Sequence, residues 1–192
     1  MERIVAIVGM CGAGKSVVAD HLVQRGFCFL RFGQLTMDEL LRRGLVVNEA
    51  NERTVREELR KEYGMAAFAL LNIPNIDRLG EHALVAIDGL YSWSEYKVLK
   101  ERYGKRLVVL AVYASPATRY ARLCLRSQDS TDAAARNRTL TPEQAASRDA
   151  AEIEKLEKGG PVSMADFLIN NEGTLDDLEQ NVTAFLEWLE AN

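Results

Sequence analysis

The sequence has few of the residues that stabilise small disulfide-bonded or zinc-binding domains. Its 192 residues include three cysteines, two histidines and four prolines. Cys11, Cys28 and Cys124 form no Cys-x-x-Cys pair, and an odd number of thiols cannot all pair with one another. With two histidines and no such pair, the chain lacks the ligand spacing of a zinc site. We therefore expect free thiols and a reducing compartment.

The sequence also lacks a long hydrophobic run. No stretch approaches the roughly 18 apolar residues that a membrane-spanning helix needs. The first apolar stretch, Ile4–Val8, is too short for a signal peptide. Apolar residues still make up 47% of the chain, which excludes a disordered or collagen-like polymer. The length fits one domain with an ordinary core. We expect a single cytoplasmic domain that does not bind membranes.

A general excess of positive charge is also missing. The net charge is −4, and residues 149–192 contain two lysines against eleven acidic side chains. Nucleic-acid-binding proteins are usually basic, so this balance argues against nucleic acid as a partner. Residues 117–148, by contrast, contain six arginines and three acidic side chains. This basic middle segment favours a compact anionic ligand.

The hydrophobic pattern predicts an α/β fold. Five short apolar runs with little alternation are typical of parallel strands covered on both faces: Arg3–Val8, Phe27–Phe32, Ala83–Ile87, Leu107–Tyr113 and Ala165–Ile169. Helical segments lie between them, which predicts βαβ units and a doubly wound parallel sheet. The intervals 33–82 and 114–164 are too long for simple crossovers, so each is expected to be an excursion that binds a ligand.

Capping signals predict several helix ends. The expected helices are Ser16–Arg25 closed by Gly26, a helix opened by a capping box at Thr36–Glu39 and running through Arg43, Glu52–Tyr63 closed by Gly64, and a final helix that starts at Thr174–Asp177.

One motif indicates a specific chemistry. The phosphate-binding pattern GxxxxGK[ST] is met by Gly9, Met10, Cys11, Gly12, Ala13, Gly14, Lys15 and Ser16. This segment lies between the first predicted strand and the first predicted helix, where the pattern requires it. Its glycines let successive N–H groups point at phosphate oxygens, and the helix adds its positive dipole end. Lys15, expected in a solvent-facing loop, can reach the β and γ phosphates, and Ser16 can bind Mg²⁺.

A second carboxylate is needed to hold or orient that metal ion. Asp88 ends the third apolar run, so it is expected at the carboxyl end of a strand, where open α/β sheets bind their ligands. If this strand lies beside the first, Asp88 faces Lys15 and Ser16. The alternative interpretation is a strand-end aspartate that caps a turn.

A cluster of arginines follows the fourth predicted strand. Arg119, Arg122 and Arg126 are spaced by three and four residues, which places them on one helical face, and Arg136, Arg138 and Arg148 follow. Guanidinium groups stabilise the charge on a phosphoryl group in transfer when the site excludes water. The alternative is a solvated helix face.

Together these motifs resemble the P-loop kinases of the nucleoside monophosphate kinase and dephospho-coenzyme A kinase group, in particular an archaeal-type branch of adenylate-kinase-like and dephospho-coenzyme-A-kinase-like proteins. The resemblance covers nearly the whole chain. Beyond the phosphate loop it rests on Leu59-Arg60, Gly64-Met65 and Ala66-Ala67, Ile87-Asp88-Gly89, Thr118-Arg119, Arg122 with Arg126, Arg148-Asp149 and Asn171-Glu172-Gly173-Thr174-Leu175.

The resemblance implies a P-loop NTPase fold with sheet order 2-3-1-4-5, and ATP with Mg²⁺ as the phosphoryl donor. It implies a core (1–32, 83–125 and 149–192), a helical acceptor-binding insert (33–82) and a lid (126–148) that closes over the substrates. By the same resemblance, the catalytic candidates are Lys15, Asp88, Arg122, Arg126 and Arg148, with Ser16 and Asp88 at the metal. Further ATP contacts are expected from Arg119 and Asn171, and acceptor contacts from Arg42, Arg56, Arg60 and Tyr91.

Two departures from the family pattern leave the acceptor open. Relatives usually carry Asp after the second strand, where this chain has Gly33-Gln34, and often carry Arg after the "IDG" element, where it has Leu90-Tyr91-Ser92. A phosphate acceptor needs no base, so the missing carboxylate favours a nucleoside monophosphate. Asp88 could still serve a hydroxyl, which keeps dephospho-coenzyme A kinase as the alternative. Arg60 is the preferred acceptor clamp; the other interpretation pairs it with Glu57.

Two other function classes fit less well. A GTPase-like switch needs an Asn-Lys-x-Asp motif, and no asparagine here is followed by lysine. A nucleic-acid-end kinase is disfavoured by the acidic segment 149–192. The expected partner is a small nucleotide-like molecule, and the sequence allows a monomer or a homodimer.

Overall fold

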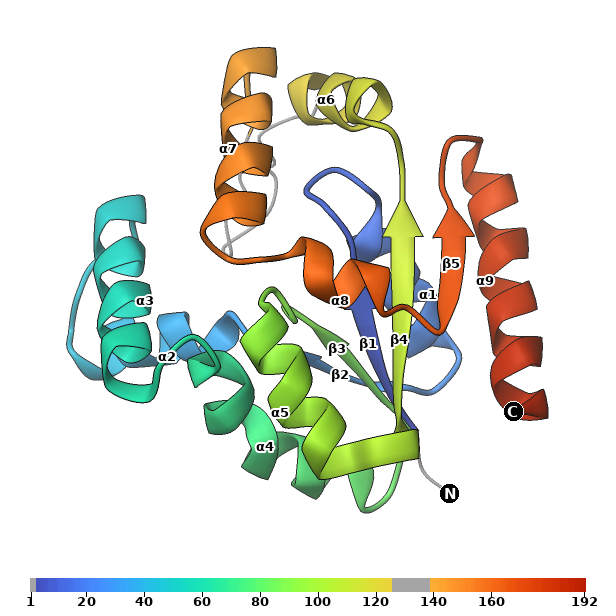
Figure 1. Ribbon diagram of the computed structural model, residues 1–192, viewed down its shortest axis with the longest axis horizontal. Coiled ribbons are helices and arrows are strands. Elements are labelled where there is room, and N and C mark those ends of the chain that lie inside the picture. Colours follow the sequence, from blue (N-terminus) through green and yellow to red (C-terminus); the bar gives the residue numbers. More distant parts are fainter. Residues whose placement is uncertain (1–2, 126–138) are drawn as a thin grey trace.

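The fold is built on one parallel sheet. The computed structural model describes residues 3–125 and 139–192. Its strands are β1 (Ile4–Val8), β2 (Cys28–Arg31), β3 (Val85–Asp88), β4 (Leu107–Tyr113) and β5 (Phe167–Asn170). They pair in the order β2-β3-β1-β4-β5, and every pairing is parallel (Figure 1). The predicted α/β class and strand order are confirmed.

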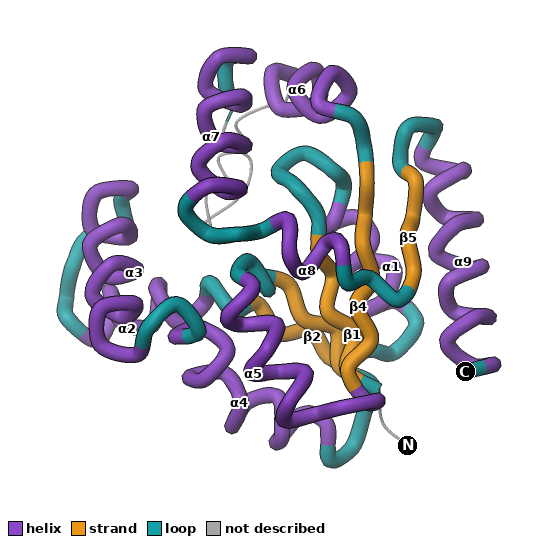
Figure 2. Tube along the Cα trace, viewed as in Figure 1, coloured by secondary structure: helices purple, strands orange, loops and turns teal. Residues whose placement is uncertain are grey.

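Helices connect all of these strands (Figure 2). They are α1 (Lys15–Gln24), α2 (Gln34–Arg42), α3 (Glu49–Tyr63), α4 (Ala67–Gly80), α5 (Trp93–Tyr103), the short 3₁₀ turn η1 (Gly104–Arg106), α6 (Pro116–Leu125), α7 (Pro142–Glu154), α8 (Gly159–Ser163) and α9 (Leu175–Ala191). The long interval after β2 therefore holds α2, α3 and α4. The interval after β4 holds α6, α7 and α8.

The core consists of two layers, one on each face of the sheet. All five residues of β1 are buried, and they alternate between the faces. Ile4, Ala6 and Val8 pack with residues of α4 and α5, whereas Val5 and Ile7 pack with residues of α1 and α9. A strand covered on both faces has no polar positions, which explains why β1 appears in the sequence as an uninterrupted apolar run.

The helix ends predicted at Gly26, Gly64 and Thr174 agree with the structure, whereas the start predicted at Thr36 does not. Thr174 caps α9 in a reciprocal capping box with Asp177, as predicted. The box predicted at Thr36 is wrong. The chain is already helical at Gly33, so Thr36 lies inside α2 and is buried. A threonine can cap only from an extended backbone at the helix start.

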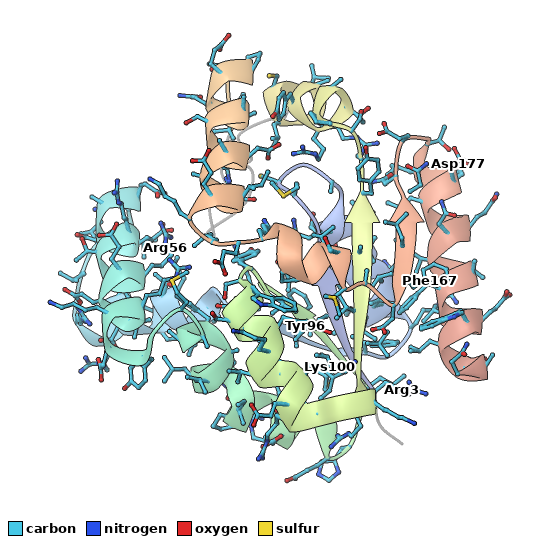
Figure 3. All side chains as sticks on the ribbon, in the orientation of Figure 1. Arg3, Arg56, Tyr96, Lys100, Phe167 and Asp177 are labelled. Atoms are coloured by element: carbon cyan, nitrogen blue, oxygen red, sulfur yellow. The ribbon has the colours of Figure 1, made fainter. Side chains whose placement is uncertain are left out.

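The insert predicted at 33–82 is divided in the structure: α3 lies to one side of the sheet, whereas α4 packs against the sheet as part of the core (Figure 1). Arg56 of α3 is on the opposite side of the molecule from Phe167 and Asp177 (Figure 3). The lid predicted at 126–148 lies partly outside the described residues, and its end falls within α7, which runs from Pro142 to Glu154. The division into core, insert and lid stays a prediction. In the part of the chain that the structure describes, no helix is long and apolar enough to cross a membrane.

Candidate active site

The phosphate loop connects β1 to α1 at the carboxyl edge of the sheet. Gly14 precedes α1 with φ 101°, a left-handed conformation that glycine adopts without strain. A side chain here would also collide with Asn171 Nδ2. The first turn of α1 contains no acidic residue, so no carboxylate competes for its positive end. The loop therefore retains the local features of an anion-binding turn.

Three side chains hold the carbonyl groups of this loop. Lys15 Nζ donates to the Met10 carbonyl (3.2 Å), Arg119 Nη1 donates to the Cys11 carbonyl (3.1 Å), and Asn171 Nδ2 donates to the Ala13 carbonyl (2.8 Å). These three bonds hold the carbonyl groups of the loop in place from within the protein.

Asp88 occupies the position that the sequence predicted for it. It ends β3, and β3 lies beside β1 with Asp88 in register with Ile7. Its Oδ1 is buried and has no hydrogen-bond partner among residues 3–125 and 139–192. A buried carboxylate oxygen without a partner suits a hard divalent cation, and Ser16 at the exposed start of α1 offers a hydroxyl. These two groups fit Mg²⁺.

Lys15 is less exposed than its expected solvent-facing loop implied, because it begins α1 and bends back to Met10. Burial, together with the nearby positive charge of Lys158, lowers the pKa of Lys15 from 10.5 to about 8, while the negative charge of Asp88 opposes the change. A bound phosphate would reverse this effect by supplying negative charge.

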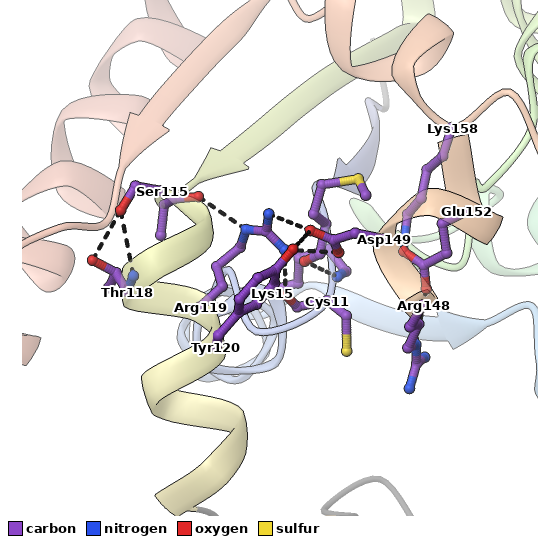
Figure 4. Close-up of polar contacts among 12 residues, drawn as sticks. Cys11, Lys15, Ser115, Thr118, Arg119, Tyr120, Arg148, Asp149, Glu152 and Lys158 are labelled. Carbon is purple, nitrogen blue, oxygen red and sulfur yellow. Dashed lines mark hydrogen bonds and ion pairs between the residues drawn. The ribbon is translucent and has the colours of Figure 1, made fainter. Parts of the chain in front are cut away.

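Arg119 supports the loop from α6. Its guanidinium forms two hydrogen bonds with Asp149 of α7 (2.9 and 2.5 Å), and Tyr120 also donates to that carboxylate (3.1 Å). Arg119 Nε donates to the Ala114 carbonyl. The side chains of Arg119 and Asp149 are only 5% and 11% exposed. Figure 4 shows this pair meeting beside Cys11 and Lys15, so α6 and α7 are joined at the phosphate loop.

The other predicted arginines differ in their surroundings. Arg122 lies one turn after Arg119 on α6, and its Nη1 is buried without a partner in the described part of the chain. Arg148 is half-exposed on α7 and pairs with Glu152 (3.1 Å). Arg126 lies outside the described residues. The catalytic roles of all three stay predictions.

A buried charge cluster that sequence reasoning missed lies next to Arg148. Glu152 of α7 binds Lys158 Nζ at 2.6 Å as well as Arg148 (Figure 4). Lys158 Nζ also lies 4.5 Å from the centre of the Tyr91 ring. Burial opposes ionisation of Glu152, but Lys158 and Arg148 hold its pKa below the usual value. One signal could have revealed this cluster: Lys158 is one of two basic residues in the acidic segment 149–192.

Tyr91 follows Asp88 by three residues, in the loop between β3 and α5. The negative charge of Asp88, together with burial, raises the pKa of the Tyr91 hydroxyl. The loop is held by Glu95, which accepts hydrogen bonds from the N–H groups of Tyr91 (2.8 Å) and Ser92 (3.0 Å). Tyr91 is therefore a neutral side chain fixed at the same sheet edge as the phosphate loop.

The loop after β5 joins the site from the other side. Asn171, predicted as an ATP contact, is buried and bonds the Ala13 carbonyl, so it supports the phosphate loop itself. Its neighbour Glu172 accepts from the Thr118 hydroxyl (2.5 Å) and from the Ser115 N–H at the start of α6. These hydrogen bonds lower the pKa of Glu172.

The three insert arginines predicted to bind the acceptor have different partners. Arg42 pairs with Glu39 on an exposed surface, and Arg56 pairs with Glu49 and Glu52. Arg60 has no ion pair among the described residues; its guanidinium lies 5.3 Å from the centre of the Phe68 ring. The alternative pairing of Arg60 with Glu57 is not seen, because Glu57 pairs with Arg53. Burial lowers the pKa of Arg60, and the charge of Glu95 opposes this.

The fold is shared with solved structures, some of which are kinases. The crystal structure of TT1252 from Thermus thermophilus matches with a TM-score of 0.63 at 24% identity, covering 98% of each chain. A shikimate kinase from Bacteroides thetaiotaomicron matches with a TM-score of 0.60 at 17% identity, again over 98% of each chain. At these identities the likeness establishes the fold alone, and the P-loop kinase fold expected from the sequence is confirmed.

Sequence comparison gives closer relatives. The UPF0200 protein of Thermococcus gammatolerans is 30% identical over 186 residues, which is 96% of this chain and 94% of that protein. The UPF0200 protein of Aeropyrum pernix is 37% identical over 177 residues, or 92% and 88% of the two chains. A family model described as an AAA domain matches residues 5–155, from β1 to the end of α7. The chain therefore belongs to this AAA domain family and to the UPF0200 proteins.

Proposed function

We propose that this protein is an ATP-dependent phosphotransferase that moves the γ-phosphoryl group to a small nucleotide-like acceptor, with nucleoside monophosphates as the preferred class. The observation that carries the proposal is the arrangement around the phosphate loop. Its carbonyl groups are held by Lys15, Arg119 and Asn171, and the unpartnered Oδ1 of Asp88 lies at the same sheet edge.

These residues have separate tasks in the proposed reaction. The loop N–H groups and the positive end of α1 bind the donor phosphates, and Lys15 neutralises charge at the β and γ positions. Mg²⁺, when bound, would neutralise further phosphate charge, with Ser16 and Asp88 as the side chains that hold it. Arg122 of α6 and Arg148 of α7 would stabilise charge on the transferred group in this proposal.

Arg60 supports a phosphate-bearing acceptor. It is half-buried, lacks an ion pair among the described residues and rests on Phe68. Glu95, whose charge acts on Arg60, also bonds the Tyr91 loop beside Asp88. Glu95 thus connects Arg60 of the predicted insert with the loop that follows Asp88 at the carboxyl edge of the sheet. A guanidinium without a carboxylate partner is available for a phosphate, which it can bind through two parallel hydrogen bonds.

A hydroxyl acceptor is the second candidate, and one observation favours it. The unpartnered oxygen of Asp88 is equally suited to accept a proton from an attacking hydroxyl. Gln34, by contrast, donates to Asp38 on the exposed side of α2, so the turn after β2 offers no base there. Shikimate kinase and gluconokinase, named among the structural neighbours, phosphorylate small molecules. Dephospho-coenzyme A is the hydroxyl acceptor that the sequence resemblance suggests.

A phosphoryl-transfer screen tests the proposal. The wild-type protein is incubated with Mg²⁺ and ATP and with AMP, CMP, GMP, UMP, dephospho-coenzyme A or no acceptor, and products are separated by chromatography. We expect turnover with a nucleoside monophosphate at least tenfold above hydrolysis, and none with Lys15→Met. Turnover with dephospho-coenzyme A alone would establish the second candidate. Hydrolysis at the same rate with every acceptor would contradict a kinase function.

A further inference from the structure

Lys158 is a buried lysine without an obvious structural purpose. It immediately precedes α8, is 2% exposed and places its ammonium group 2.6 Å from Glu152 Oε2. Lysine is rarely buried this completely, because desolvation of the ammonium group offsets much of what its ion pair contributes. An apolar pair of similar volume usually stabilises a fold at least as well. The presence of Lys158 therefore calls for a function.

The ammonium group of Lys158 lies near the carboxyl edge of the sheet, where the proposed reaction takes place. It contacts the face of Tyr91, which follows Asp88 by three residues, and Asp88 is in register with β1 just before the phosphate loop. The charges of Lys158 and Lys15 act on each other strongly enough to contribute to the low pKa of Lys15. Two ammonium groups that act on each other repel, and an anion that binds both would remove this repulsion.

The surroundings of Glu152 would allow Lys158 to leave it for another anion. This carboxylate has two cationic partners, Lys158 at 2.6 Å and Arg148 at 3.1 Å. If Lys158 turned toward another anion, Glu152 would still be paired with the Nε of Arg148, which leaves the two Nη groups of Arg148 for the transferred phosphoryl group. The exchange would therefore leave no buried carboxylate without a partner, which is the usual obstacle to breaking a buried ion pair.

We propose that Lys158 is a second phosphate-binding lysine, which exchanges Glu152 for the terminal phosphoryl oxygens of the bound nucleoside triphosphate. The inference rests on the proposed function and adds a ligand for the γ-phosphoryl group from outside the phosphate loop. Lys15 and Lys158 would then hold the same group from β1–α1 and from α7–α8, and each would neutralise charge on it. Nucleoside diphosphates lack this group, so Lys158 would discriminate between ATP and ADP.

The test compares nucleotide affinities rather than turnover alone. Dissociation constants for the non-hydrolysable β,γ-imido analogue of ATP and for ADP are measured calorimetrically with Mg²⁺. The proteins are the wild type, Lys158→Met and the charge-balanced double variant Lys158→Met/Glu152→Gln. Lys155→Met, which changes an exposed lysine three residues earlier, is the matched control. The single variant leaves the Glu152 carboxylate with Arg148 as its partner. The double variant removes both charges of the Lys158–Glu152 pair, so no buried carboxylate loses its lysine.

We expect the double variant to bind the ATP analogue about tenfold to hundredfold more weakly than the wild type, as for loss of a charge-assisted hydrogen bond to phosphate. Its affinity for ADP should change less than about threefold, and Lys155→Met should match the wild type. Lys158→Arg should recover part of the affinity for the analogue. If the double variant bound the analogue with wild-type affinity, Lys158 would only neutralise the charge of Glu152. The inference about Lys158 would then be overturned, and the proposed function would stand. No binding of the analogue by the wild type would overturn the proposed function as well.

Discussion

Arg119 of α6 and Asp149 of α7 form a buried ion pair through two hydrogen bonds, and the same guanidinium donates to the Cys11 carbonyl of the phosphate loop. The region predicted as a lid, residues 126–148, comprises the segment between these two helices and the start of α7. Any change in the position of α7 relative to α6 would thus be transmitted to the loop by one side chain. We therefore expect the pair to couple nucleotide binding to the geometry of α6 and α7.

This coupling predicts a double-mutant result. Arg119→Met should destabilise the protein by about 3–5 kcal/mol, because it leaves the buried Asp149 carboxylate without its main partner. Arg119→Met/Asp149→Leu should recover most of this stability but still bind ATP weakly, since the Cys11 carbonyl is no longer held. Urea unfolding and nucleotide titration measure the two effects. Full recovery of ATP affinity in the double variant would show that Arg119 is only structural.

The second prediction concerns pH and Lys15. Because its pKa in the free protein is about 8, Lys15 loses its charge as the pH rises above 8. The kcat/KM for ATP, which reports on the free enzyme, should therefore fall above pH 8. At saturating ATP the effect should be smaller, because phosphate restores the charge. Binding of the β,γ-imido analogue by Lys15→Met should show no such break.

The free energy of unfolding should rise with pH where kcat/KM for ATP falls. Between pH 8 and 10.5 the unfolded chain keeps a proton on Lys15 that the folded chain has lost, so the free energy of unfolding should rise with pH across this window. At pH 7 the folded protein carries the full cost of a charged, partly buried lysine. Lys15→Met should therefore raise Tm by a few degrees, on the order of 1 kcal/mol, in calorimetry at pH 7. A lowered Tm would contradict this account of Lys15.

Asn171 should contribute to nucleotide affinity without touching the nucleotide. Asn171→Ala frees the Ala13 carbonyl and opens space beside Gly14, so we expect ATP and ADP to bind about fivefold to twelvefold more weakly, equivalent to roughly 1–1.5 kcal/mol. Asn181→Ala is the matched control, because Asn181 also donates its amide to a backbone carbonyl, that of Asn170, but on the exposed surface. Equal losses in both variants would contradict a specific role for Asn171.

Arg60 distinguishes the two acceptor classes. If the acceptor carries a phosphate, Arg60→Ala should raise its KM and lower kcat/KM about tenfold to hundredfold, while the Kd of ATP stays unchanged. The control is Arg53→Ala, which removes an exposed arginine paired with Glu57 on the same helix. Unchanged acceptor kinetics in Arg60→Ala, together with loss of activity toward dephospho-coenzyme A in Asp88→Asn, would exclude the monophosphate and favour the hydroxyl acceptor.

The sequence by itself determined the parts of this protein that depend on local backbone requirements. The phosphate loop needs glycine at particular positions between a strand and a helix, and strands covered on both faces must be uniformly apolar. Both constraints are visible in a few consecutive residues, such as Ile4–Val8 and the glycines up to Gly14. For the same reason, the apolar run before Asp88 was enough to place this residue at the carboxyl end of a strand.

Only the tertiary structure decided which partner each charged side chain takes. Arg119 meets Asp149 across 30 positions of the sequence, Asn171 reaches Ala13 across 158, and Lys158 lies over Tyr91. Lys158 matches no motif, and Arg60 rests on Phe68 instead of pairing with Glu57 one turn away. Burial and charge pairing depend on what the fold brings together from distant segments, and spacing within one helix does not contain that information.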